Sequence, residues 1–252
     1  MVVKNLDFAY GKHQVLKNIS FQIKEGGITT LIGANGCGKS TLFHIMTKNL
    51  KPQKGQVLLH GEDIKNIPLK KFAKEVSIVH QYNTAPHDLT VEKLVGYGRI
   101  AYSSYSRRNK EEDEKYISWA LEVTETTAFR KKNISELSGG QRQRVWIAMA
   151  LAQNTKFLFL DEPTTYLDIK YQLDILKLVQ KLNREFGITI LMVLHDINQA
   201  IHYSDEIIAM KEGRIIAQGQ PSKIITEDTI QEAYGIRLHV KNIDGNRFVM
   251  TV

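Results

Sequence analysis

The sequence of 252 residues predicts an α/β fold with a parallel β-sheet at its core. Short apolar runs rich in β-branched residues recur along the chain, and segments with helical spacing lie between them. Strands that are apolar throughout are buried on both faces, which is typical of parallel sheets covered by helices. A glycine-rich segment at 33–40 also stands between the first such run and a helical segment.

Four apolar runs are the expected core strands, and two segments with helical periodicity are expected helices. The strands are predicted at 28–32, 76–79, 157–160 and 189–194, and the helices at 40–46 and 171–186. In the second helix, apolar residues spaced three positions apart give one apolar face suited to packing against a sheet. That face consists of Leu173, Leu176, Val179 and Leu182.

Three regions depart from this alternation. Residues 1–25 change to a period of two, which predicts a small antiparallel sheet. Residues 91–150 have helical character, strongest at 111–123, and no strand pattern. The tail predicts short strands, a helix at 228–234 and a hairpin turn at 244–246. We expect a single domain over 1–252, made of a core at 1–90 and 151–219, a helical subdomain at 91–150 and a tail at 220–252.

Composition narrows the class of protein and of partner. The formal charge of +7 and the pI near 9.3 are consistent with a partner such as nucleic acid, an anionic membrane surface or a nucleotide. They are equally consistent with a basic surface that is simply solvated. The single cysteine, Cys37, excludes an intrachain disulfide and agrees with a reducing compartment. The apolar run at 188–194 is far shorter than the roughly 20 residues that span a bilayer. The N-terminal residues lack a signal-peptide pattern, so we expect a cytosolic protein.

The segment 33–40 reads GANGCGKS and matches the phosphate-loop pattern G-x-x-x-x-G-K-[ST]. Glycines let consecutive N–H groups face a phosphate, and the following helix N-terminus adds partial positive charge. Lys39 is expected to pair with the β- and γ-phosphates of ATP, and the Ser40 hydroxyl to ligate Mg²⁺. Cys37 fills a variable position as a small residue. The residues of the loop expected to bind ATP are Gly33, Asn35, Gly36, Cys37, Gly38, Lys39, Ser40 and Thr41.

A strand that ends in two carboxylates supplies the other half of a catalytic site. Residues 157–160 are apolar, and Asp161 and Glu162 follow at once. In a chain with a phosphate loop, Asp161 is expected to hold Mg²⁺ and Glu162 to polarise the attacking water. Taken alone, the same pattern would be an ordinary strand end.

A second glycine pair, in LSGGQ at 137–141, precedes a helical segment that extends to residue 150. Together with the phosphate loop before it and the paired carboxylates after it, this motif resembles the signature of the ATP-binding subunits of ABC (ATP-binding cassette) transporters. The resemblance runs from Leu6 to about Gly219. It implies ATP hydrolysis and a P-loop NTPase cassette, with a parallel-sheet core, an N-terminal antiparallel subdomain and an inserted helical subdomain.

The resemblance assigns further residues. Tyr10 matches the aromatic residue that stacks on adenine, Gln81 the glutamine that senses the γ-phosphate and links to the membrane partner, and His195 the histidine at the γ-phosphate. His80 stands before the glutamine, where these relatives usually have proline. The implied catalytic residues are Glu162, His195 and Gln81, and the implied Mg²⁺ ligands are Ser40, Gln81 and Asp161.

The family also explains why one chain has two phosphate loops. In such proteins two copies pack head to tail, and the signature motif of one copy closes over the γ-phosphate held by the other. N–H groups at a helix N-terminus lose their target when ATP becomes ADP, so closure of the homodimer reports on hydrolysis. The residues implied to act in trans on the partner's ATP are Ser138, Gly139, Gly140, Gln141 and Asp168.

The resemblance also implies the partners and the cargo. A cassette in a chain separate from the membrane part is common among bacterial importers. It implies a location at the cytoplasmic face of the membrane, integral-membrane permease subunits and, indirectly, an extracytoplasmic substrate-binding protein. Segments 90–99, 162–169 and 193–200, with Tyr166 as a marker, resemble the ATPases that drive ferric siderophore uptake. Haem, cobalamin and metal ions are the alternative cargoes.

A nucleic-acid function is the second class of hypothesis. The +7 charge allows it, and residues 97–108 interleave aromatic and basic side chains as some single-strand binders do. Cassette ATPases of DNA repair have long coiled-coil insertions, and those of translation usually carry two cassettes. The sequence has neither feature. We therefore interpret 97–108 as a docking surface for the permease and expect no nucleic-acid partner.

Overall fold

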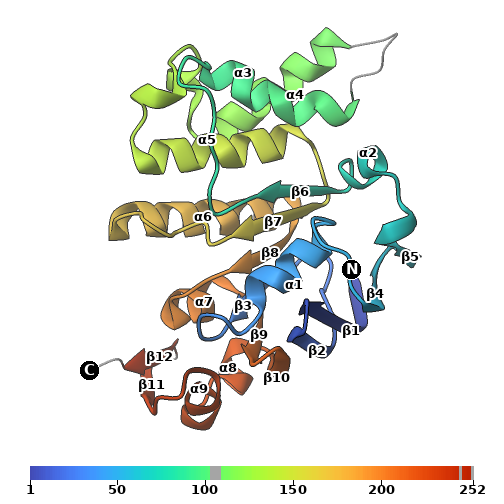
Figure 1. Cartoon of the computed structure of the whole chain (residues 1–252). Helices are drawn as coiled ribbons and strands as arrows, with labels where there is room; N and C mark the ends of the chain where they lie inside the picture. The colour runs from blue at the N-terminus through green and yellow to red at the C-terminus, as the bar shows by residue number, and fades with distance from the viewer. Residues whose placement is uncertain (103–108, 244–245, 251–252) are drawn as a thin grey trace. The chain divides into compact units, whose positions relative to one another are not determined.

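The computed structural model describes residues 1–102, 109–243 and 246–250. The chain forms two compact units, Met1–Ile67 with Thr189–Val252, and Pro68–Ile188 (Figure 1). Residues 103–108 of the predicted docking segment and 244–245 of the predicted hairpin turn lie outside the described residues.

The first unit begins with an antiparallel sheet of order β2-β1-β4-β5. Its strands are β1 (Val2–Tyr10), β2 (His13–Gln22), β4 (Lys54–Leu59) and β5 (Glu62–Asp63). Burial alternates along the end of β2, where Ile19 and Phe21 are buried and Ser20 is exposed, as a half-solvated sheet requires. The antiparallel sheet predicted at 1–25 is confirmed. The sequence pattern did not predict that β4 and β5 complete it.

A second sheet of the first unit has the strand order β10-β9-β3-β8. Its members are β3 (Ile28–Ile32), β8 (Thr189–Val193), β9 (Glu206–Lys211) and β10 (Arg214–Gly219). Strand β3 runs parallel to both of its neighbours, and every residue of β3 and β8 is buried. Because β3 and β8 are parallel neighbours, the segments that follow them leave the sheet at the same edge.

Helices and a terminal hairpin complete the first unit. They are α1 (Lys39–Met46), η1 (Ile64–Asn66), α7 (Ile197–Tyr203), α8 (Pro221–Ile224), α9 (Glu227–Tyr234) and the strands β11 (His239–Ile243) and β12 (Asn246–Met250). The helices predicted at 40–46 and 228–234 and the short strands of the tail are therefore confirmed. Figure 1 shows β12 beside α7. The side chain of Asn198 in α7 hydrogen-bonds to the backbone N–H and to the backbone carbonyl of Val249 in β12.

The second unit contains two parallel strands and a long amphipathic helix. Strand β6 (Val76–Val79) pairs with β7 (Phe157–Asp161), and α6 (Ile169–Phe186) follows β7. Asp168 caps α6 at its start, and Gly187, at φ 67°, ends it. The predicted apolar face is buried at Leu176, Val179 and Leu182, whereas Leu173 is 36% exposed. A short helix, α2 (Leu69–Phe72), precedes β6.

The rest of the second unit is helical, as predicted for 91–150. Its helices are α3 (Val91–Gly96), η2 (Tyr97–Tyr102), α4 (Lys110–Val123), η3 (Thr127–Phe129), η4 (Ile134–Glu136) and α5 (Gly139–Ala152). Arg99 is 2% exposed. It donates to Asp113 Oδ1 at 2.9 Å and to the Ala152 carbonyl at 3.0 Å, so this buried cation is paired. The contacts fasten the C-terminal end of α5 to α4, which lies beside it in Figure 1.

No helix in the described part of the chain is long and apolar enough to span a membrane.

Candidate nucleotide-binding site

The glycine-rich loop at 33–40 joins the end of β3 to the start of α1. Gly33 and Gly38 have φ values of 143° and 105°, which L side chains rarely adopt. A Cβ atom at Gly33 would also lie 2.3 Å from the Met210 carbonyl oxygen, and one at Gly38 would lie 2.8 Å from a methyl group of Leu16. Both backbone conformation and packing therefore require glycine here. The loop ends at the N-terminus of α1, where unpaired N–H groups favour an anion.

Lys39 is folded back onto its own loop and is 5% exposed. Its Nζ donates to the carbonyl oxygens of Gly33 at 2.7 Å and Ala34 at 3.0 Å, and it lies 3.8 Å from the Sγ atom of Cys37. These partners satisfy a buried ammonium group. A phosphate would offer charged acceptors in place of neutral carbonyls, and charge-assisted hydrogen bonds are about twice as strong. The Lys39 ammonium would therefore form stronger hydrogen bonds with a bound polyphosphate than with these carbonyl oxygens.

His195 leaves the same sheet edge as the glycine-rich loop. Leu194 donates its N–H to the Leu31 carbonyl at 3.3 Å, so the chain stays beside β3 up to the residue before the histidine. His195 is exposed, and Asp196 then caps α7 by accepting from the N–H of Gln199 at 2.9 Å. The carboxyl edge of a parallel sheet is the usual ligand position in α/β folds.

Tyr10 ends β1 and keeps its ring accessible. The residue is 53% exposed, and its ring lies nearly perpendicular to that of Phe8 at a centroid distance of 4.9 Å. A perpendicular ring contact of this kind holds the orientation of the tyrosine. About half of the residue stays accessible, as the predicted stacking on a planar base would require.

The second unit presents its candidate residues at the carboxyl ends of β6 and β7. Asp161 ends β7 and is 6% exposed, and Glu162 follows it. Gln81, just after β6, donates from Nε2 to Glu162 Oε2 at 2.5 Å. Thr165 Oγ1 donates to the same oxygen at 3.1 Å. The fold thus joins two predicted catalytic residues that are 81 positions apart, and two neutral donors hold the carboxylate that we predict to act as the base.

A tight turn follows β7. Glu162 and Tyr166 have φ values of 50° and 63°, and the left-handed region costs a non-glycine residue roughly 1–3 kcal/mol. The Tyr166 hydroxyl lies 3.0 Å from the Tyr82 hydroxyl, and this hydrogen bond raises the pKa of Tyr82. Sequence reasoning used Tyr166 only as a marker and missed Tyr82, because no pattern in the chain pairs two tyrosines so far apart. Consecutive residues 81 and 82 therefore both hold the turn that contains Glu162.

The residues predicted to hold Mg²⁺ offer oxygen donors of three kinds. They are the hydroxyl of Ser40, the amide of Gln81 and the carboxylate of Asp161. Mg²⁺ prefers oxygen ligands and is usually bound through one or two carboxylates together with substrate phosphates and water. No cluster of three or more His, Cys, Asp or Glu side chains suited to a metal occurs among the residues that the structure describes. The donor set fits an ion that arrives with its nucleotide.

The signature motif at 137–141 forms the start of α5. Ser138 Oγ accepts from the Gln141 N–H at 3.4 Å, and Gln141 Oε1 accepts from the Ser138 N–H at 3.0 Å, which is a capping box. Asp168 has the corresponding position on α6, where Oδ1 accepts from the Tyr171 N–H at 3.0 Å. Three of the residues predicted to act in trans therefore also begin helices in the single chain. The capping box leaves the Ser138 hydroxyl proton available to an acceptor outside the helix.

The two glycines of the signature are packed differently, which gives a first prediction. A Cβ atom at Gly140 would lie 2.4 Å from the ring of Tyr171, whereas one at Gly139 would meet only a methyl group of Leu167, at 3.6 Å. We expect Gly140→Ala to lower the free energy of unfolding by about 1–3 kcal/mol, as overpacking does. Gly139→Ala should leave the unfolding free energy unchanged or slightly higher, because alanine favours helix.

Denaturant unfolding of the two variants in the absence of nucleotide measures this difference. Equal unfolding free energies for the two variants would contradict the packing of Gly140 against Tyr171.

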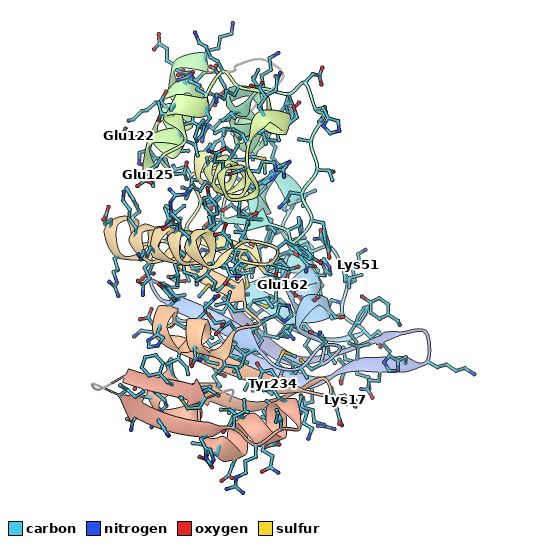
Figure 2. All side chains as sticks on the ribbon, turned by 90° about the vertical axis from the view of Figure 1, so that its left-hand side faces the viewer. Lys17, Lys51, Glu122, Glu125, Glu162 and Tyr234 are labelled. Atoms are coloured by element: carbon cyan, nitrogen blue, oxygen red, sulfur yellow. The ribbon has the colours of Figure 1, made fainter. Side chains whose placement is uncertain are left out.

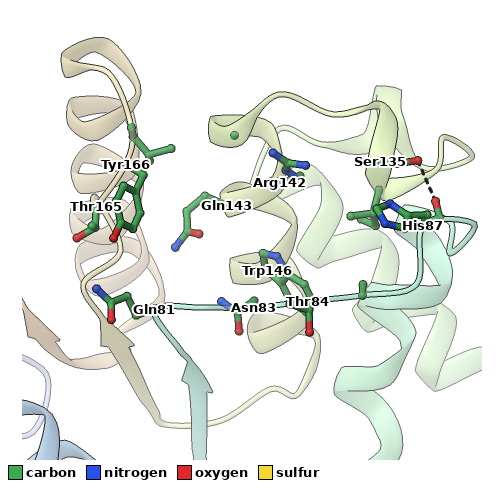
Figure 3. Close-up of a pocket in the computed structure, with 14 residues that line it drawn as sticks. Gln81, Asn83, Thr84, His87, Ser135, Arg142, Gln143, Trp146, Thr165 and Tyr166 are labelled. Atoms are coloured by element: carbon green, nitrogen blue, oxygen red, sulfur yellow. Dashed lines mark hydrogen bonds between the residues drawn. The ribbon is translucent and has the colours of Figure 1, made fainter.

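A cavity of about 460 Å³ lies in the second unit (Figure 3). It is lined by the segment that begins at Gln81, by the first turns of α5 and by the turn at 165–167. In Figure 3, Arg142, Gln143 and Trp146 project from α5, opposite Thr165 and Tyr166, with Gln81 near the base. The segment after Gln81 crosses beneath them and is fastened where Ser135 donates to the His87 carbonyl at 2.9 Å. The full lining is Gln81, Asn83, Thr84, Ala85, His87, Ile134, Ser135, Gly139, Arg142, Gln143, Trp146, Thr165, Tyr166 and Leu167.

Comparison with known proteins gives consistent matches along the chain. The family model for ABC transporters matches residues 16–165. The ferric enterobactin transport ATP-binding protein FepC of Escherichia coli strain K12 is 44% identical over 234 residues, which are 93% of this chain and 86% of that protein. The iron(3+)-hydroxamate import ATP-binding protein FhuC of Bacillus subtilis strain 168 is 46% identical over 233 residues, or 92% and 87% of the two chains.

The structure has matching relatives as well. The dimeric structure of MJ0796, a bacterial ABC transporter cassette, superimposes with a TM-score of 0.75 at 31% sequence identity and covers 87% of this chain and 98% of that one. The same cassette has been solved as a dimer in a post-hydrolysis state bound to ADP and Pi. The predicted fold class is therefore confirmed.

Proposed function

The chain belongs to the ABC transporter family and is an ATP-hydrolysing subunit of such a transporter. We propose that it drives the uptake of ferric siderophores. The observation that supports this cargo is the 44–46% identity to two siderophore-system ATPases over more than 90% of the chain. An ATPase subunit does not touch the cargo, so the inference rests on similarity of the whole subunit.

The proposed reaction is attack of water on the γ-phosphorus of ATP, which forms a bond to the water oxygen, breaks the bond to the β–γ bridging oxygen and releases ADP and inorganic phosphate. The loop at 33–40 binds the phosphates through N–H groups and through Lys39, whose present partners are neutral carbonyls. Ser40, Asp161 and Gln81 would hold Mg²⁺, and the ion would supply positive charge against the charge that develops on the phosphate oxygens. Glu162 takes the proton from the attacking water. His195 donates a hydrogen bond to the γ-phosphate.

Gln81 has a second role in this proposal, as the link between the base and the membrane partner. Its Nε2 holds the Glu162 carboxylate, and the residues that follow it line the cavity shared with α5 and the turn at 165–167. A permease segment that moves the loop at 82–87 would move Gln81 with it. The position of the base would then depend on the state of the transporter.

The working unit in this proposal is a homodimer. Ser138, Gly139, Gly140, Gln141 and Asp168 act in trans, on ATP held by the partner copy. The N-terminus of α5, a helix of 14 residues, offers its first N–H groups to a terminal phosphate. Solved dimers of the MJ0796 cassette support dimerisation of this family. The remaining partners are integral-membrane permease subunits at the cytoplasmic face and, through them, a substrate-binding protein.

The cargo is tested by uptake. In a strain of the source organism that lacks any paralogue, deletion of this gene should abolish accumulation of ⁵⁵Fe-labelled ferric siderophore. The wild-type gene should restore it. A copy carrying Lys39→Ala serves as the matched control for loss of ATP turnover. Parallel assays with labelled haem, cobalamin and free metal ions separate the alternative cargoes. Unchanged siderophore uptake together with loss of one of the others would replace the proposed cargo.

A further inference from the structure

The C-terminal helix α9 reaches the glycine-rich loop. The hydroxyl oxygen of Tyr234, the last residue of α9, accepts a hydrogen bond from the Gly33 N–H at 3.1 Å. The two residues are 201 positions apart. Ile230 and Ala233 of the same helix are buried, and α9 contacts β9 and β10. Tyr234, labelled in Figure 2, is therefore held in place by packing as well as by its hydrogen bond.

The end of the chain is fastened to the helix that follows His195. Asn198 donates to the Val249 carbonyl at 3.0 Å and accepts from the Val249 N–H at 2.8 Å. Beside this pair, the rings of His202 and Phe248 lie 4.7 Å apart. The C-terminal part of the chain thus contacts the loop after β3 through Tyr234, and helix α7, which follows β8, through Phe248 and Val249.

We propose that Tyr234 is a positioning residue of the nucleotide site, which fixes the first residue of the phosphate loop while ATP is bound. This inference rests on the proposed role of the loop at 33–40. The C-terminal segment would then be part of the ATP site, although it lies outside residues 16–165, where the family model matches.

The physical argument is an exchange of partners at Gly33. In the free chain the residue is held from two sides, because its N–H binds Tyr234 and its carbonyl binds the ammonium of Lys39 at 2.7 Å. When Lys39 turns to the phosphates of ATP, the second of these bonds is given up. Tyr234 then holds Gly33 without the help of Lys39. Loss of the tyrosine hydroxyl should therefore weaken the ATP-bound state more than the free state.

The chemical state of Tyr234 suits this role. Burial raises its pKa to about 12, so the hydroxyl keeps its proton at physiological pH. A neutral hydroxyl accepts from Gly33 through a lone pair and keeps its own proton to donate elsewhere. The rigid phenol ring also loses little conformational freedom in making the contact.

The test compares Tyr234→Phe with the wild-type full-length protein. We expect the dissociation constant for ATP and the KM for ATP to rise roughly three- to tenfold, which is the range for one neutral hydrogen bond. The kcat should stay within about twofold, because the variant alters binding and not the transferred group. The melting temperature without nucleotide should fall by less than about 4 °C, and the rise in melting temperature on adding ATP should shrink.

Tyr203→Phe is the matched control. Tyr203 is half-buried in the same unit, and its hydroxyl makes no hydrogen bond within the described part of the chain. It should bind ATP as the wild type does. Wild-type ATP affinity in Tyr234→Phe, with Lys39→Ala inactive, would overturn the role of Tyr234 and leave the phosphate loop intact. Wild-type activity in Lys39→Ala would instead reject the phosphate loop. A fall in kcat of Tyr234→Phe by more than about twofold, with an unchanged KM for ATP, would also overturn the positioning role.

Discussion

Lys39→Ala should lose at least about a hundredfold in ATP affinity and turnover, because it removes the charged donor that we propose to pair with the phosphates of ATP. The structure gives a second consequence. Lys39 Nζ satisfies the Gly33 and Ala34 carbonyls, and the variant leaves both without this donor. The Ala34 carbonyl keeps the Cys37 N–H as a donor at 3.3 Å, whereas the buried Gly33 carbonyl loses Lys39, and an unsatisfied buried acceptor costs about 1–3 kcal/mol. The free protein should therefore also unfold at lower denaturant concentration than the wild type.

The matched control is Lys51→Ala. Lys51 is exposed in the same unit and is labelled in Figure 2, so its removal changes net charge equally without touching the loop. It should keep wild-type phosphate release, ATP affinity and unfolding free energy. Binding of a fluorescent ATP analogue, phosphate release and denaturant unfolding are measured on all three proteins. Wild-type ATPase activity in Lys39→Ala would reject the assignment of the loop.

The strands that carry the site could be predicted because burial on both faces favours apolar and β-branched residues along their length. Strands β3, β7 and β8 are buried at every position, and each was expected within one residue of its observed bounds. Strand β4 reads KGQVLL, with an exposed lysine and glycine at its start. Such a strand is defined by its pairing with β1 and not by its own composition, so local pattern could not reveal it.

Some features of the site can be recognised from neighbouring residues in the sequence, and others depend on residues that are far apart in it. The spacing of glycines and lysine in GANGCGKS is enough to indicate phosphate binding, and the capping box of the signature lies within five residues. The pairs Gln81 with Glu162 and Gly33 with Tyr234 join residues 81 and 201 positions apart. Only the sheet order and the packing of α9 bring them together. Family resemblance supplied the role of Gln81, whereas no pattern indicated Tyr234.

Glu162→Gln should lower ATP hydrolysis by roughly 10²–10⁴-fold, the usual contribution of a general base. The side-chain shape is kept, and an amide oxygen can still accept from Thr165 and Gln81, which now donate to Glu162 Oε2 at 3.1 and 2.5 Å. The left-handed backbone at this position also stays occupied by a residue of the same size. Binding of ATP should therefore remain within about twofold of wild type, because the variant removes a transition-state interaction.

The same variant tests the dimer. With hydrolysis blocked, the terminal phosphate that the signature helix of the partner copy recognises is not lost, so an ATP-bound dimer should accumulate. Multi-angle light scattering after size exclusion, with ATP and Mg²⁺ present, measures the mass. Glu122→Gln removes an exposed carboxylate of α4, labelled in Figure 2, and should hydrolyse ATP at the wild-type rate without a trapped dimer. A monomer of Glu162→Gln that binds ATP but does not hydrolyse it would keep Glu162 as the base and reject the action of Ser138 and Gly140 in trans. Hydrolysis at the wild-type rate would reject Glu162 as the base.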